Sequence, residues 1–168
     1  MERLVALCAS WSSLYDHSKL VAGTVMGVHI MALFIGGGLA IAADRLTLRV
    51  PSTDVPNRRV QLDEVCNVHG IVLVSVILLF VSGVLLAAAD VETFFGSPVF
   101  WVKLAFVAAL VVNGALLTRI ETSLTKRPGV DPSAIDDATW ARVRLFSRSS
   151  VFLWIATAVV GIVLSNAA

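Results

Sequence analysis

A run of residues without a charged side chain, residues 21–43, constrains this chain more than any other feature of the sequence. It reads VAGTVMGVHIMALFIGGGLAIAA and lies between Lys19 and the pair Asp44-Arg45. At a rise of about 1.5 Å per residue it forms a helix of roughly 34 Å, which is enough to cross a hydrocarbon core of about 30 Å. We therefore expect a transmembrane helix here.

The composition agrees with a membrane protein. Hydrophobic residues make up 57% of the 168 residues, charged residues make up 15%, and the mean hydropathy is +0.85. These values are too apolar for an ordinary soluble domain. The net charge of +1 gives no sign of a nucleic-acid partner, so the lipid bilayer is the expected environment.

Three further apolar segments have the length of a membrane span or a large part of one. They cover about residues 68–89, 99–117 and 151–164, and polar sequence precedes the second and the fourth span. We predict an all-α fold, with residues 1–168 forming one membrane domain, a four-transmembrane-helix bundle. Helices two and four should extend beyond the membrane on the same face.

A shorter helix is expected ahead of the first span. Residues 3–15 carry apolar side chains at helical spacing, which is typical of an amphipathic helix lying in the membrane interface. Trp11 and Tyr15 would anchor it at the headgroup level. A second interpretation is that this helix is a lid over a ligand pocket.

The distribution of basic residues predicts the orientation. Three of the 13 lysines and arginines, namely Arg3, Lys19 and Lys103, fall on the face that holds the two termini, and the other ten fall on the opposite face. Loops rich in lysine and arginine stay in the cytoplasm. We therefore expect a multi-pass protein of the cell's inner (plasma) membrane with both termini outside the cytoplasm.

His29 is the most deeply placed ionisable residue. It lies about ten residues from the outer boundary of its span, or roughly 15 Å deep, where a polar side chain needs a partner. The partners expected at this depth are Ser82, Thr157 and a metal centre. Gly36 follows on the same helical face, and the ridge that it forms with Ala32 and Ala40 faces either a neighbouring helix or a cofactor.

A second histidine, His69, opens the possibility of a haem. Imidazole binds haem iron, so His29 and His69 are candidate metal ligands for haem b, with Gly36 and Trp154 as candidate cofactor-binding residues. However, His69 lies roughly 7 Å from the cytoplasmic boundary and His29 roughly 21 Å from it. This difference argues against one shared iron and leaves open a haem held by His29 alone.

The depth of His69 also suggests a plainer role. Asn113 and either Ser149 or Ser150 should lie at the same level on their own helices, so these side chains are expected to form a shallow polar cluster with His69. Lys103 is shallower than His29 and is expected to extend outward along its own stem.

Several classes of enzyme and transporter lack support in the sequence. It contains no nucleotide-binding glycine loop, no Ser/His/Asp order and no HExxH motif. Its carboxylates fall in loops or at the ends of spans, which counts against a pump or transporter driven by a buried carboxylate. A redox or structural subunit is therefore favoured over a stand-alone enzyme.

Two segments carry a family resemblance. VHIMALFIGGGLAIAADRLTL resembles the first span, and SGVLLAAADVETFFGSPVFWVKLAFVAALVVNG the second hairpin, of a poorly characterised bacterial family of four-span membrane proteins. The resemblance covers about residues 20–120. This part of the chain is also, more distantly, similar to copper-resistance protein D-type and b-type cytochrome membrane domains. It points to His29, Lys103 and Asn113 and implies haem or electron transfer.

Three functions remain open at this stage. The first is a membrane subunit with b-type haem that transfers electrons. The second is a non-catalytic anchor or assembly subunit, which would have other membrane subunits as partners. The third is a small permease or a metal-handling protein.

Overall fold

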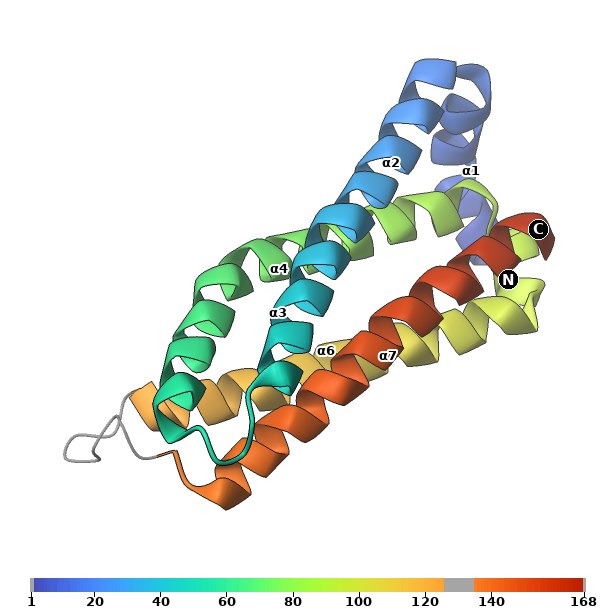
Figure 1. The fold of residues 1–168 in the computed structure, drawn as a ribbon. Coiled ribbons are helices and arrows are strands. Elements are labelled where there is room, and N and C mark those ends of the chain that lie inside the picture. The colour runs from blue at the N-terminus through green and yellow to red at the C-terminus, as the bar shows by residue number, and fades with distance from the viewer. Residues whose placement is uncertain (1, 126–134, 168) are drawn as a thin grey trace.

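The computed structural model describes residues 2–125 and 135–167, and within these residues the chain consists of helices joined by short turns, without a strand (Figure 1). The predicted all-α fold is confirmed. The elements in chain order are α1 (Glu2–His17), α2 (Lys19–Ala32), the π-helix η1 (Leu33–Gly37), α3 (Gly38–Arg49), α4 (Val55–Ala89), α5 (Val91–Gly96), α6 (Pro98–Thr125) and α7 (Asp137–Ala167).

Four helical segments of the described chain are long and apolar enough to cross a membrane, which confirms the predicted number of spans. They are Lys19–Arg49, Val55–Ala89, Pro98–Ile120 and Asp137–Asn166. At about 1.5 Å per residue, the 35 residues of α4 make a rod of roughly 52 Å, well beyond a core of about 30 Å. The polar first turns of α4 therefore extend past the membrane, as expected.

The first span is one helical rod with a wider turn in its middle. The helix passes from α2 through η1 into α3 with helical backbone angles at Leu33 and Gly38. A π-helical turn holds more residues than an α-helical one and so rotates the faces on its two sides relative to each other. The rod continues past Asp44 to Arg49, because no helix-breaking residue occurs before Pro51.

Both ends of the chain lie at one end of the bundle, which we call the terminal end (Figure 1). α1 folds back and packs against the last turns of α4, where Trp11 Nε1 donates to the Leu85 carbonyl at 2.8 Å and Ser12 Oγ donates to the Ala89 carbonyl at 2.7 Å. The short helix α5 follows α4. It was not foreseen in the sequence, where this stretch reads as a plain connection.

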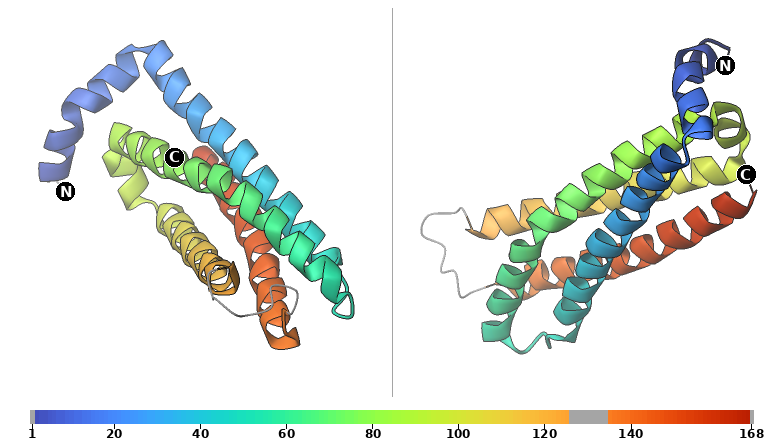
Figure 2. Two further views of the ribbon diagram at one scale, coloured as in Figure 1. Left: turned by 90° about the vertical axis from the view of Figure 1, so that its left-hand side faces the viewer. Right: turned by 90° about the horizontal axis from the view of Figure 1, so that it is seen from above.

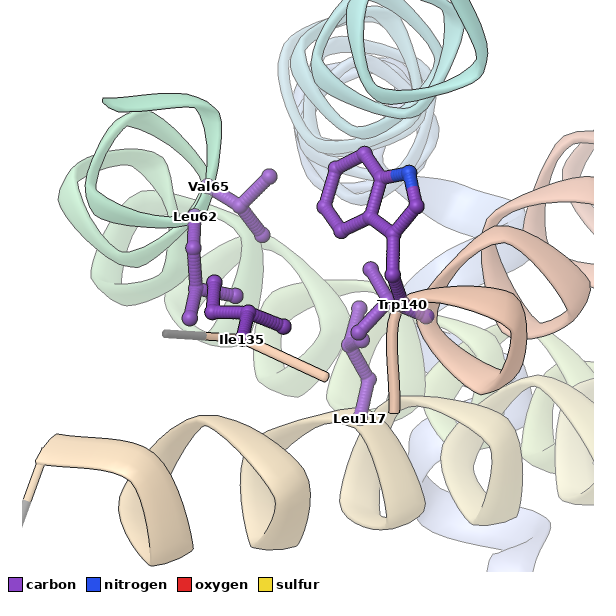
Figure 3. Close-up of a cluster of buried hydrophobic side chains, with 6 residues drawn as sticks. Leu62, Val65, Leu117, Ile135 and Trp140 are labelled. Carbon is purple, nitrogen blue, oxygen red and sulfur yellow. The ribbon is translucent and has the colours of Figure 1, made fainter. Parts of the chain in front are cut away.

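The opposite end, which we call the loop end, is fastened by one arginine. The side chain of Arg58 is 1% exposed. It donates to the carbonyls of Ile135 and Ser52, and it pairs with Asp137 at the start of α7. Beside it lies a buried apolar cluster drawn from α4, α6, α7 and the short segment before α7, which is shown in Figure 3. The cluster consists of Leu62, Val65, Leu117, Ile135, Trp140 and Val143.

The four spans are arranged as two pairs. α2, η1 and α3 pack along α4, α6 packs along α7, and α3 joins the pairs through its contact with α7 (Figure 2). By contrast, α4 and α6 make very few backbone approaches within the described chain. The interior of the bundle is therefore bounded by α4 and α6 without being closed by direct contact between them.

Candidate functional site

His29 is held by the hydroxyl group expected from its depth. His29 Nδ1 on α2 lies 2.8 Å from Ser82 Oγ on α4, and Ser82 Oγ donates to the Leu78 carbonyl at 2.5 Å. A hydroxyl has one proton, so Ser82 accepts the hydrogen bond from His29 and Nδ1 carries the ring proton. In the neutral imidazole this arrangement leaves Nε2 unprotonated.

The surroundings of His29 bring together all four spans. A Cβ atom built on Gly83 of α4 would lie 3.5 Å from His29 Cε1. Lys103 of α6 is close enough to interact electrostatically with His29, and its Nζ lies 3.6 Å from the Cβ position of Gly161 on α7. The Lys103 side chain lies against the neighbouring helix α7, where Gly161 leaves room for the ammonium group. The expectation that Lys103 extends outward along its own stem stays a prediction.

The glycines deeper in the first span meet protein on the facing helices. A Cβ on Gly36 would lie 2.5 Å from Ser75 Cβ on α4, and one on Gly37 would lie 3.0 Å from the ring of Trp154 on α7. Trp154 is 3% exposed. The ridge of small residues therefore serves close helix packing, which was one of the two roles expected for it.

The two histidines are far apart along the bundle. Ser82, which binds His29, lies thirteen residues after His69 on α4, or about 20 Å along the helix axis. His69 and His29 therefore do not meet at one iron in this structure. Among the residues that the structure describes, no group of three or more histidine, cysteine, aspartate or glutamate side chains could hold a metal ion.

A cavity of about 220 Å³ lies in the loop half of the bundle, between α3, α4, α6 and α7. His69 Nε2 lies 2.9 Å from Thr118 Oγ1, and Thr118 donates to the Gly114 carbonyl at 2.9 Å. Asn113 Nδ2 donates to the Phe146 carbonyl at 3.1 Å. The structure thus brings His69, Asn113 and Ser150 together, as the depth argument predicts. The polar side chains on the cavity wall are Asp44, His69, Asn113, Thr118 and Ser150.

Asp44 is the member of this wall that the sequence analysis missed. It is 4% exposed, and its carboxylate interacts with the hydroxyl group of Ser150 on α7. The ion pair formed within the described residues is that of Arg58 with Asp137, so Asp44 has no cationic partner there. The interpretation that the chain lacks a buried carboxylate is therefore wrong.

A signal for Asp44 was present in the sequence. Ala32, Gly36 and Ala40 form the buried ridge of the first span at a spacing of four, and Asp44 is the next residue in this series. Burial of Asp44 is expected if the helix of the first span continues beyond Asp44, which is the first charged residue after Lys19.

Trp154 separates the cavity from the cluster around His29. Its ring forms part of the cavity wall and rests on Gly37. On the same face of α7 but one turn nearer the terminal end, Thr157 is 8% exposed, and its hydroxyl has no hydrogen-bond partner among the described atoms. It is therefore not the partner of His29, although its depth made it a candidate.

The comparisons with known proteins identify a family for the chain. Residues 15–166 match a family described as a family of unknown function, DUF6644. No curated protein and no solved structure matches the chain. The expected distant similarity to copper-resistance protein D-type and b-type cytochrome domains stays a prediction.

Proposed function

The chain belongs to DUF6644, a family of unknown function, and we propose that it is a small proton-handling permease with Asp44 as its proton-binding group. One observation carries this proposal: a carboxylate that is 4% exposed lines a cavity inside a membrane bundle without a cationic partner in the described chain. Burying an unpaired charge is costly, and carboxylates in such positions mark ion and proton pathways.

The cavity is suited to water and protons rather than to a large ligand. Its volume of about 220 Å³ corresponds to roughly seven water molecules at about 30 Å³ each. Hydroxyl, amide and imidazole groups share the cavity wall with Asp44, and each of them can exchange hydrogen bonds with water. We infer that His69 passes protons between this water and the loop end.

Trp154 would be the barrier on the other side. It fills the level of Gly36 and Gly37, and one turn nearer the terminal end lies the buried hydroxyl of Thr157, which has no hydrogen-bond partner among the described atoms. Passage of a proton therefore requires Trp154 to move or a water molecule to reach Thr157. On this proposal, Trp154 closes the cavity toward the terminal end.

Proton flux across vesicles tests the proposal. The purified protein is reconstituted into liposomes that contain a pH-sensitive dye, and a potential of about 100 mV is imposed with potassium and valinomycin. We expect the wild type to carry protons faster than protein-free vesicles and Asp44→Asn to remove this flux. Asp16→Asn is the control, because Asp16 is exposed on α1. Equal flux in wild type and Asp44→Asn, or no wild-type flux, would contradict the proposal.

Haem binding is the second candidate, and one observation favours it. Ser82 fixes the proton of His29 on Nδ1, which leaves Nε2 able to bind a metal. The space argues against it, because Ser75 and Trp154 fill the region beside Gly36 and Gly37. The cavity is also smaller than the pockets of about 300–1,000 Å³ that hold drug-sized ligands. The residues present therefore do not fit a macrocycle without rearrangement.

A spectrum decides the haem question. A reduced-minus-oxidised spectrum and a haem stain are recorded for wild type, His29→Gln and His69→Gln, each expressed with an adequate haem supply. Haem lost only with His29→Gln would support a single-ligand haem protein and displace the permease proposal. An anchor or assembly role would be supported by other membrane subunits that copurify with the chain.

We also infer the orientation from the basic residues. Eight of the 11 lysines and arginines that the structure describes belong to the loop end, so on this proposal the loop end faces the cytoplasm and both termini lie outside. A reporter that is active only in the periplasm should give signal when fused after Ala168. Signal from a reporter that is active only in the cytoplasm would overturn this orientation.

A further inference from the structure

A second hollow lies on the bundle surface, between α6 and α7 at the loop end. Its volume is about 290 Å³, and it is separate from the cavity that holds Asp44. α6 and α7 pack side by side along this region. The groove is lined by Leu116, Arg119, Ile120, Ser123, Arg142 and Phe146.

The groove lies at the level where the hydrocarbon core meets the headgroups. Along α6, Leu116 is eighteen residues after Pro98, or roughly 27 Å, and Arg119 is twenty-one residues after it, or roughly 32 Å. A hydrocarbon core is about 30 Å thick. The apolar part of the groove therefore faces acyl chains, and the arginine part faces headgroups.

The two arginines present positive charge that the described protein does not neutralise by an ion pair. Arg119 and Arg142 are both exposed, and neither forms a salt bridge with a described carboxylate. Arg142 interacts electrostatically with Asp136, whose pKa is lowered first by the hydrogen bond with Thr139 and only to a smaller degree by Arg142. Both guanidinium groups are thus available to an external anion.

We propose that this groove binds one anionic phospholipid, with its phosphate between Arg119 and Arg142 and an acyl chain along Leu116 and Phe146. Guanidinium groups bind phosphate oxygens in pairs of parallel hydrogen bonds, and basic pockets between membrane helices bind anionic headgroups. The apolar floor favours a lipid over a dissolved phosphate, because only a lipid has an acyl chain whose burial against the floor adds binding free energy. This site does not depend on the proposed proton transport.

Native mass spectrometry of the delipidated protein in mild detergent tests the site. Phosphatidylglycerol is titrated against phosphatidylcholine, and soluble glycerol phosphate is titrated separately. We expect one phosphatidylglycerol to bind roughly tenfold or more tightly than phosphatidylcholine. We expect the double variant Arg119→Gln/Arg142→Gln to lose this preference.

A charge-matched double variant serves as the control. Arg49 and Arg148 are exposed arginines outside the groove, so Arg49→Gln/Arg148→Gln should keep the preference for phosphatidylglycerol. If the glutamine variant of the groove does not fold, Arg119→Lys/Arg142→Lys replaces it and should weaken binding, because lysine lacks the guanidinium fork. Equal losses in groove and control variants would mean diffuse attraction and overturn the proposal. Equal binding of glycerol phosphate and phosphatidylglycerol would overturn it as well.

Discussion

The terminal and loop halves of the bundle contain the same pairing of a histidine with a hydroxyl group, yet their interiors differ. In the terminal half, Ser82 binds His29, and the region below it is filled by Trp154. In the loop half, Thr118 binds His69, and a cavity of about 220 Å³ lies beside the pair. A buried histidine is therefore a weak marker of a site. Empty volume next to an unpaired carboxylate is a stronger one.

The largest expected loss of stability comes from adding a side chain at Gly36, where the facing helices already fill the interior of the bundle. In Gly36→Leu, the new Cβ atom would lie 2.5 Å from Ser75 Cβ, so α4 and the first span must separate. Overpacking of this kind costs about 3 kcal/mol or more, the upper end of the usual range. Thermal unfolding in detergent should show a large loss of stability.

Gly38→Leu provides the matched control for this prediction. Gly38 belongs to the same glycine run, but a Cβ atom there meets nothing within 4 Å. It should behave almost as wild type does. Similar unfolding temperatures for the two variants would mean that the ridge faces lipid and that Gly36 does not pack against α4.

Smaller changes in stability are expected from substituting the two histidines, and the proton flux of these variants should differ between the two halves of the bundle. His29→Gln and His69→Gln each replace an imidazole by an amide that can still reach the hydroxyl, so each should lose about 1 kcal/mol or less of stability. Only His69 borders the cavity, so only His69→Gln should slow proton flux in the liposome assay. Slower flux in His29→Gln alone would place the pathway in the terminal half.

Much of this arrangement follows from residue depth along the spans. The depth argument indicated Ser82 as a partner for His29 and grouped His69 with Asn113 and Ser150, because helices of constant rise place equal depths side by side. The depth argument failed for Asp44, because this first charged residue was taken as the end of the span. The helix continues to Arg49, and Asp44 is buried with the ridge before it.

Two other features could not be derived from spacing. The π-helical turn at η1 rotates the two parts of the first span relative to each other, and a fixed period of 3.6 does not include such a turn. The position of the Lys103 side chain depends on the space beside Gly161, which lies 58 residues later in the chain on another helix. Both features are set by packing between helices, which a single sequence encodes only indirectly.

The smallest effect, and the sharpest contrast with Gly36, is expected at Gly114. This glycine lines the cavity, and a Cβ atom there meets nothing within 4 Å. Gly114→Ala should therefore be accepted without strain, and because alanine favours the helix by up to about 1 kcal/mol, thermal unfolding should occur at an unchanged or slightly higher temperature. The added methyl group also removes part of the space for water, so proton flux should fall without a loss of stability. Reduced stability in Gly114→Ala would mean that other side chains fill the cavity in the membrane. Both halves of the bundle would then have filled interiors.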